Sequence, residues 1–301
     1  MFLSQKMKDS KIIWLFICLV LMGCQQSDQL PTTGNFQPGM ALFDRAIIGL
    51  MEKWQIPGGS LAVMQDGEVL LARGYGYADA VSAELVQPDS LFRIASISKP
   101  FTAVVVLQLV ENGILTLDTP VFQYLDDLQP LDGMDVDPRI DEITIRHLLE
   151  HSGGWDRNVS YDPMFMPSDI ARAAGTPEPA DCTTIIRYML GQPLDFDPGS
   201  QYAYSNFGYC ILGRVIEKAS GIPYEAYVAT HILDPIEIED MRLGHSCYPS
   251  DIRTRFTITG VSRTLPNPCF PMKPNSQPGR MAAFIWKRWI LTVAGLHPPR
   301  I

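Results

Sequence analysis

A long apolar helix is predicted after residue 96. It constrains the fold, because other helices or strands have to shield its apolar side chains from water. Pro100 suits its first turn, where a missing backbone N–H leaves no hydrogen bond unmade. The apolar run ends at Asn112-Gly113, a typical helix stop, after passing through Val104, Leu107, Leu109 and Val110. We therefore expect a buried helix around which the rest of the chain packs.

Ser96 and Lys99 lie at the start of this helix, three residues apart. Residues at i and i+3 share a helix face, so the serine hydroxyl and the lysine amine can come within hydrogen-bonding reach. In an apolar setting, part of the lysine is expected to be neutral and able to take the serine proton, while the helix N-terminus favours negative charge on the oxygen. The pair is a candidate nucleophile and base. The alternative is that Ser96 caps the helix and Lys99 is solvated.

A mixed α and β chain is predicted around this helix. Residues 41–54 have the apolar spacing of an amphipathic helix. Residues 60–65 and 68–77 are rich in strand-forming side chains, and Asp66-Gly67 between them is a strong signal for a two-residue hairpin turn. Helical patterns dominate afterwards, over residues 144–150, 182–190, 206–219 and 223–233.

A second candidate segment precedes the predicted helix at 206–219. Tyr204 has a phenol that can relay a proton beside a cation, and Asn206 has an amide that can donate to and accept from a substrate amide at once. The alternative is an aromatic-rich loop that packs on the core. His147 and His151 are less favoured as bases, because their positions at helix ends indicate capping or core roles.

These motifs resemble those of the serine hydrolases related to class C β-lactamases, a family that includes D-alanyl-D-alanine carboxypeptidases and esterases. The likeness rests on Ser96-Ile97-Ser98-Lys99 and Tyr204-Ser205-Asn206, and it runs from about residue 43 to 244 through segments 148–154 and 196–199. It implies an α/β (α+β) fold of the β-lactamase/transpeptidase type, with an antiparallel sheet flanked by helices and an all-helical subdomain.

The same resemblance implies the roles of the site residues. Ser96 corresponds to the serine that is acylated, Lys99 and Tyr204 to the residues that handle protons, and Asn206 to the residue that orients the substrate. Which of Lys99 and Tyr204 acts as the base stays open. No cofactor is implied.

One part of the family pattern is missing. The family carries a third motif, Lys-Thr-Gly or His-x-Gly, on a strand that lines the site and contributes a backbone N–H to the oxyanion hole. The sequence contains no Lys-Thr-Gly, and His151-Ser152-Gly153 precedes the tyrosine motif and ends a predicted helix. Loss of one oxyanion donor alone reduces rates by about 10²–10³-fold, so we expect impaired activity.

The composition changes abruptly near residue 251. Residues 252–301 contain no Asp or Glu but eight Lys or Arg and seven Pro, whereas all 33 acidic residues precede them. Codons permitted for residues 280–301, read in a frame offset by two nucleotides, can encode PYGGFYLEAMDSHGGWIASAPD, which looks like family sequence. We interpret residues 251–301 as an aberrant, frameshifted basic tail, with the family's C-terminal strands missing. The alternative is a genuine basic surface helix over residues 284–296.

The first 23 residues have the pattern of a bacterial export signal. Three lysines precede an apolar run over residues 12–22, and Gly23 stands before Cys24 as in the lipobox of bacterial lipoproteins. We expect Cys24 to be lipidated and residues 24–38 to form a flexible tether. The protein would then be anchored in the bacterial cell envelope and face the periplasm. The alternative is a plain membrane anchor or an uncleaved signal.

Charge and cysteine content narrow the possible partners. The formal net charge of −9 argues against nucleic acid, which would require a basic surface. Four cysteines remain outside the signal, and none of their spacings is typical of a metal site. An oxidising periplasm would permit disulfides, but Cys210 lies in an apolar helical pattern and is expected to be a small core residue.

Four segments are thus predicted: a lipoprotein signal peptide (1–23), a tether (24–38), a partial hydrolase domain (39–250) and the basic tail (251–301). The predicted function is that of an exported serine hydrolase that forms an acyl-enzyme on a β-lactam, a D-Ala-D-Ala peptide or an ester. Its expected partners are a small-molecule or cell-wall peptide substrate and, through the lipid, the membrane. The alternative is a catalytically dead, membrane-tethered protein that at most binds such compounds.

Overall fold

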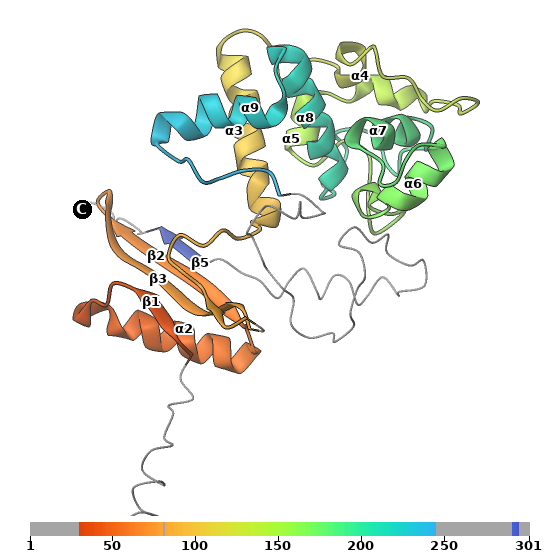
Figure 1. The fold of residues 1–301 in the computed structure, drawn as a ribbon. Coiled ribbons are helices and arrows are strands. Elements are labelled where there is room, and N and C mark those ends of the chain that lie inside the picture. Colours follow the sequence, from red (N-terminus) through yellow and green to blue (C-terminus); the bar gives the residue numbers. More distant parts are fainter. Residues whose placement is uncertain (1–29, 81, 245–290, 295–301) are drawn as a thin grey trace, which may run out of the picture. The chain divides into compact units, whose positions relative to one another are not determined.

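The computed structural model describes residues 30–80, 82–244 and 291–294, and the chain divides into two compact units (Figure 1). The described part of the first unit comprises residues 30–90, without residue 81, and the strand at 291–294. The second unit comprises residues 91–244 of the described chain. The predicted signal peptide, Cys24 and most of the basic tail lie outside the described residues.

The first unit is a sheet with a helix along one face (Figure 1). The helix is α2 (Ala41–Trp54), and the strands are β1 (Thr32–Gly34), β2 (Gly58–Gln65), β3 (Glu68–Asp79), β4 (Glu84–Leu85) and β5 (Leu291–Ala294). The sheet order is β1-β3-β2-β5, and β4 pairs with β3. β3 is antiparallel to β1, β2 and β4, whereas β5 runs parallel to β2.

The helix and hairpin predicted for this unit are confirmed. α2 spans the predicted residues, and Asp66-Gly67 joins β2 to β3. Both turn residues have positive φ, 52° and 85°, as a two-residue turn that follows the strand twist requires. Met51 of α2 packs against Leu61 and Leu71 of the sheet, so the apolar side of the helix holds it on the sheet.

Two short strands differ from the sequence predictions. β1 lies within residues 24–38, the expected flexible tether, where pairing with β3 makes Thr32–Gly34 extended. β5 lies within residues 284–296, where the alternative interpretation places a basic helix, and residues 291–294 instead pair with β2. The unpaired backbone groups along an edge strand readily accept another extended segment. The tail therefore supplies one strand to a sheet for which the sequence predicts missing C-terminal strands.

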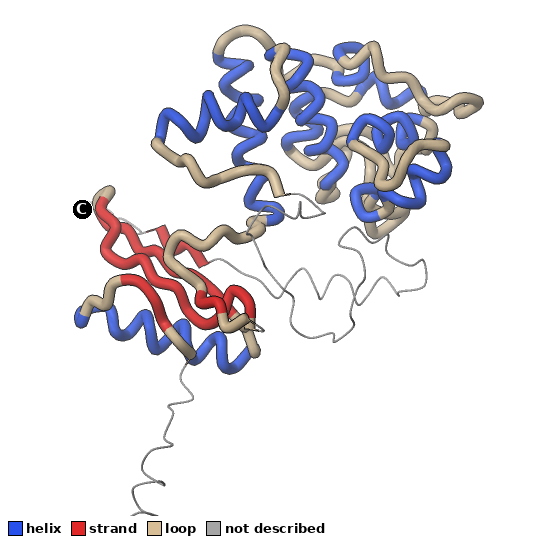
Figure 2. The backbone as a smooth tube through the Cα atoms, viewed as in Figure 1, coloured by secondary structure: helices blue, strands red, loops and turns tan. Residues whose placement is uncertain are grey.

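Helices dominate the second unit (Figure 2). They are α3 (Ser98–Glu111), α4 (Val121–Tyr124), α5 (Ile145–Leu149), α6 (Pro167–Ala174), α7 (Cys182–Leu190), α8 (Asn206–Ser220) and α9 (Tyr224–Val228), which continues into a π-helical turn at Ala229–Leu233. The sequence predicts each of these helices except α4 and α6. Within the described residues, no helix combines the length and the hydropathy needed to cross a bilayer.

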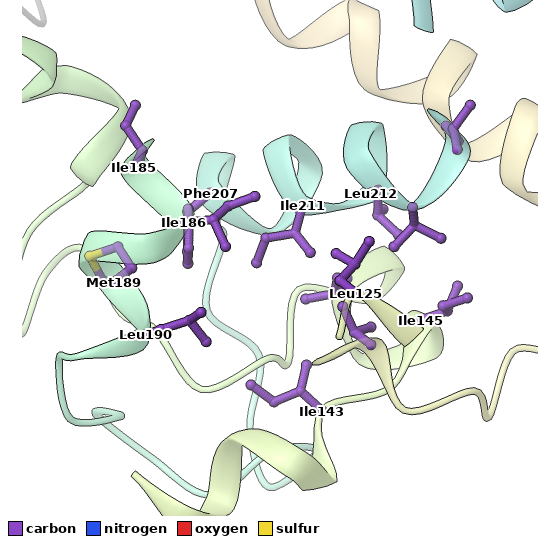
Figure 3. Close-up of a cluster of buried hydrophobic side chains, with 14 of the residues drawn as sticks. Leu125, Ile143, Ile145, Ile185, Ile186, Met189, Leu190, Phe207, Ile211 and Leu212 are labelled. Carbon is purple, nitrogen blue, oxygen red and sulfur yellow. The ribbon is translucent and has the colours of Figure 1, made fainter. Parts of the chain in front are cut away.

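α8 lies in the middle of this unit's core. Its residues Phe207, Ile211 and Leu212 are buried, and Figure 3 shows them beside apolar side chains of α7 and of the segment around α5. Full burial of one such side chain contributes about 1.5–3 kcal/mol. Packing in the core therefore fixes the position of the N-terminal end of α8. Asn206 is the first residue of this helix, and Tyr204 lies two residues before it.

The prediction that the helix after residue 96 is buried is wrong for one of its faces. Val105, Val106 and Leu109 of α3 are buried, but Val104 and Leu107 are 45% and 49% exposed. α3 packs against α8, which covers one side of the helix. An apolar composition all round the helix does not distinguish a covered face from an open one.

The expectation that Cys210 is an unpaired core residue is also wrong. Cys210 of α8 forms a disulfide with Cys182 at the start of α7, with a Cα–Cα distance of 6.2 Å. Helical periodicity reports that a position faces inward, but it does not report which side chain the position meets. Cys247 and Cys269 lie outside the described residues.

Reduction of this disulfide is expected to destabilise the helical unit. The bond closes a loop of 28 residues in sequence, and the loss of such a constraint on the unfolded chain corresponds to about 3–4 kcal/mol. Denaturant unfolding with and without dithiothreitol measures the effect. The double variant Cys182→Ser/Cys210→Ser is the control, because its stability should already be lowered and should not respond to the reductant. Equal midpoints for the oxidised and reduced protein would contradict the prediction.

Candidate active site

Ser96 lies in a short 3-10 turn, Ala95–Ile97, directly before α3. Its side chain is exposed. The preceding residue, Ala95, has a φ of 46°, a left-handed conformation that residues with a Cβ adopt only at an energetic cost of about 1–3 kcal/mol. Such strain is typical of functional sites, and here it immediately precedes the candidate nucleophile.

Lys99 is in the first turn of α3, and its amine lies near two polar and two aromatic groups. Its Nζ lies 3.5 Å from Ser96 Oγ and donates to Asn206 Oδ1 over 2.7 Å. The same amine lies 4.7 Å from the ring centre of Tyr204 and 5.5 Å from that of Tyr209. The spacing of Ser96 and Lys99 in sequence therefore does bring the two side chains together, as predicted.

Tyr204 completes the contacts of the serine. Its hydroxyl donates to Ser96 Oγ over 2.6 Å, from a position 108 residues away in sequence. Ser205 is the N-cap of α8 and accepts the Gly208 N–H over 3.0 Å, which fixes the backbone between Tyr204 and Asn206. The alternative that this segment is only an aromatic-rich loop on the core does not account for the contact with Ser96.

Asn206, the first residue of α8, is held from both ends of its amide. Oδ1 accepts from Lys99, and Nδ2 donates to Asp162 Oδ2 over 2.6 Å. Asn206 is predicted to bind a substrate amide with its N–H and its oxygen at once. Both groups already have partners inside the protein, so a substrate would have to compete with these contacts. One N–H of the amide is left for a substrate carbonyl.

The two histidines have different positions. His147 is the third residue of α5, where its side chain and the Thr144 hydroxyl form a capping box, as the expected capping role requires. His151 is half-buried beside the site, with its ring 4.6 Å from that of Tyr204 and 5.1 Å from that of Tyr209. Its Nδ1 accepts the Ser205 N–H over 3.1 Å, and its carbonyl accepts the Ala203 N–H.

Sequence reasoning did not identify four contributors to this site: Ala95, Asp162, Tyr209 and Arg157, whose guanidinium lies 5.1 Å from the Tyr204 ring centre. Asp162-Pro163 at the start of a turn is a capping signal in the sequence. No local sequence signal, however, indicates that Asp162 contacts Asn206, which lies 44 positions further along the chain.

The arrangement can perform nucleophilic catalysis. An exposed serine oxygen lies within reach of both an amine and a phenol, so two groups are placed to accept and return its proton. The residues described by the structure bring together no three His, Cys, Asp or Glu side chains that could hold a metal ion. The described residues contain no Lys-Thr-Gly, the motif that the family resemblance would place beside these groups.

Acid is expected to destabilise the site through His151. Burial lowers the pKa of its imidazole below the ordinary value of 6.5, and the positive charge of Lys99 acts in the same direction. Between the lowered pKa and 6.5 the unfolded chain binds more protons than the folded one, so stability present at pH 7 is lost as the pH falls. Protonation also removes the acceptor for the Ser205 N–H.

The measurement is the melting temperature between pH 7.5 and 5. His151→Asn keeps an acceptor near the Nδ1 position but does not titrate, so the variant should lose less stability than the unmodified protein on acidification. Parallel pH curves for the two proteins would show that His151 contributes nothing to the acid response.

Comparisons with known proteins identify a family and several relatives. The model of a family described as Beta-lactamase matches residues 43–283. Esterase EstB of Burkholderia gladioli is 32% identical over 205 residues, which cover 66% of this chain and 49% of the esterase. The chain spans less than half the length of the curated relatives it matches, between 36% and 49% for four of them.

Two solved structures are similar as well. The octameric penicillin-binding protein homologue from Pyrococcus abyssi is 29% identical, with a TM-score of 0.55 over 66% of this chain and 43% of that one. D-amino acid amidase from Ochrobactrum anthropi SV3 is 27% identical, with a TM-score of 0.52 over 68% of this chain and 53% of that one. The fold expected from the sequence is confirmed by this likeness.

Proposed function

The chain belongs to the Beta-lactamase family of serine hydrolases, and on that premise we propose that it forms an acyl-enzyme through Ser96 on an ester, a peptide-like amide or a β-lactam. The observation that carries the proposal is the position of Ser96 Oγ, 2.6 Å from the Tyr204 hydroxyl and 3.5 Å from the Lys99 amine. Both neighbours can exchange a proton with the serine. A serine that only caps a helix has no use for such partners.

The reaction proceeds in two steps. The Ser96 oxygen attacks the substrate carbonyl carbon while its proton passes to Lys99 or Tyr204. The bond to the alcohol or amine then breaks, the leaving group takes a proton from the same pair, and the acyl group stays on Ser96. Water attacks the acyl carbon in the second step, releases the carboxylic acid and restores the serine hydroxyl.

The substrate class follows from this chemistry and from the relatives. EstB is named as an esterase and the Ochrobactrum protein as a D-amino acid amidase, so both bond types occur among similar proteins. A cell-wall peptide ending in D-Ala-D-Ala, a β-lactam or a simple ester would each present the carbonyl that Ser96 attacks. In a β-lactam the leaving nitrogen remains attached to the acyl group.

We consider a second candidate function because the described residues contain no Lys-Thr-Gly. Without the oxyanion donor of that motif, both steps lose transition-state stabilisation. The chain would then act as a slow acylating or merely binding protein for the same compounds.

Intact-mass spectrometry tests the proposal and separates the two candidates. The full chain is incubated with p-nitrophenyl acetate, benzylpenicillin or a fluorophosphonate, and its mass is followed with time. A single added acyl group that decays supports a hydrolase, and a single group that persists supports the slow acylating protein. No covalent addition from any of the three compounds would contradict the proposal.

Export and lipid anchoring through Cys24 form part of the same proposal. The basic start, the apolar run and Gly23-Cys24 support it, and so does the disulfide between Cys182 and Cys210, since disulfides persist mainly in oxidising compartments. The protein would face the periplasm of a bacterial cell envelope, where cell-wall peptides are available.

Lipidation predicts incorporation of labelled palmitate when the full chain is expressed in a bacterial host. Cys24→Ala should lose the label and retain residues 1–23, because the modified cysteine defines the cleavage point. Cys18→Ala, in the same segment but outside the lipobox, is the matched control and should keep the label. Label that persists in Cys24→Ala would refute the assignment.

A further inference from the structure

We propose that Asp162 is a positioning residue for the active site: it fixes which way the Asn206 amide points and, through that amide, where the Lys99 amine lies. The inference rests on the proposed function, because it assigns a residue to the same site. It is carried by two consecutive hydrogen bonds, from Lys99 Nζ to Asn206 Oδ1 and from Asn206 Nδ2 to Asp162 Oδ2.

Asp162 is itself firmly held. It is the N-cap of the 3-10 turn Pro163–Phe165, and its Oδ1 accepts the Met164 N–H over 3.0 Å. Its side chain is half-buried and the following Pro163 is buried. The other oxygen, Oδ2, accepts from Asn206 over 2.6 Å, so both carboxylate oxygens have a defined donor.

The chemistry of the partners makes the direction of the chain unambiguous. A primary amide can present either its oxygen or its nitrogen to a neighbour, but a carboxylate only accepts, and the lysine nitrogen carries N–H donors in either protonation state. Asp162 therefore selects the nitrogen of Asn206, and the oxygen is left facing Lys99. A turned amide would place N–H groups against the lysine donors and an oxygen against the carboxylate.

This orientation matters for Lys99 because its contact with Ser96 is long. The amine lies 3.5 Å from Ser96 Oγ but only 2.7 Å from Asn206 Oδ1, so the amide is the shorter of the two polar contacts that place it. Loss of that acceptor would free the amine to move away from the serine.

A double-variant cycle on the full chain tests the hydrogen-bond chain without requiring activity. In Asp162→Asn the oxygen stays with the Met164 N–H and the new NH₂ group faces Asn206. In Asn206→Asp two carboxylates face each other. We expect each single change to lower the melting temperature by roughly 3–8 °C, and the combined variant, in which donor and acceptor are complementary again, to lose less than either single variant.

Asp181 provides a matched control in the same unit. It caps α7 by accepting the Thr184 N–H over 2.7 Å, and no bond from it to Asn206 is found among the described contacts. Asp181→Asn removes the same charge from a similar cap, so its effect should add to that of Asn206→Asp. Additive losses for Asp162→Asn and Asn206→Asp as well would overturn the proposal.

The second part of the proposal, that Asp162 places the Lys99 amine beside Ser96, is tested by the rate at which a fluorophosphonate labels Ser96. Asp162→Asn should slow labelling roughly 10- to 100-fold, at least as much as Asp162→Ala, because the amide forces the wrong orientation whereas alanine only releases it. A rate equal to that of the unmodified protein would overturn the proposal. If the unmodified protein is not labelled at all, the proposed function fails, while the melting-temperature cycle still decides whether Asp162 orients Asn206.

Discussion

Ser96→Ala is expected to abolish covalent acylation and to reduce any hydrolysis by roughly 10⁴-fold or more, because the variant has no oxygen to form the acyl bond. The side chain is exposed and makes no core contact, so the melting temperature should change by no more than a degree or two. Hydrolysis of a p-nitrophenyl ester and intact-mass analysis measure the effect.

Ser98→Ala is the matched control for this change. Ser98 is also exposed, lies two residues further along the same motif and begins α3, but it makes no contact with Tyr204 or Lys99 among the described interactions. Its activity should stay within a few-fold of the unmodified protein. Equal activity of Ser96→Ala and the unmodified protein would remove the basis for the assignment.

Lys99→Met is expected to slow acylation by about 10²–10⁴-fold, the usual contribution of a general acid or base. Methionine has nearly the length of lysine but neither donates to Asn206 nor carries a proton for Ser96. The loss should appear in the acylation rate at every pH between 6 and 10. Stopped-flow acylation by an activated ester measures it.

Lys218→Met serves as the control for loss of a lysine. Lys218 pairs with Asp127 over 2.7 Å at the surface, on the last turn of α8, and has no contact with the site residues in the described part of the chain. Its acylation rate should be unchanged. A Lys99→Met variant that acylates as fast as Lys218→Met would assign the proton transfer to Tyr204 alone.

Much of the fold follows from local patterns. α2 and α7 have the predicted bounds, and the hairpin around Asp66-Gly67 is confirmed, because each depends on residues adjacent in sequence. The sequence pattern does not indicate α6, because the helix has few apolar residues. Pro167 suits a helix start, but no clear change of pattern separates it from the loop before it. Local patterns do not predict β5, because this segment is extended only through its pairing with the edge of β2.

The site divides in the same way. Ser96 and Lys99 are neighbours on one turn, so their proximity is a local prediction, and the family resemblance adds Tyr204 and Asn206. The hydrogen bond from Asn206 to Asp162 and the disulfide between Cys182 and Cys210 join residues that only the packed fold brings together. Apolar periodicity predicts that such positions face inward, but it does not say which side chain they meet.

The proposed acyl transfer needs an oxyanion donor as well as a nucleophile. Ser96, Lys99 and Tyr204 are in contact, so a candidate nucleophile lies beside two groups that can move its proton. Removal of one such donor typically lowers rates by about 10²–10³-fold, and the described residues contain no Lys-Thr-Gly, the motif expected to carry it. We therefore expect acylation to be easier to detect with a highly activated reagent than turnover of a natural peptide.

The most direct test of the central claim is to locate the covalent adduct by peptide mapping. The full chain is treated with a fluorophosphonate, digested and analysed by tandem mass spectrometry. We predict one modified residue, Ser96, with no label on Ser98 or Ser205. Label on another residue that persists in Ser96→Ala, or a chain that remains unlabelled, would contradict the claim that Ser96 is the nucleophile of a serine hydrolase.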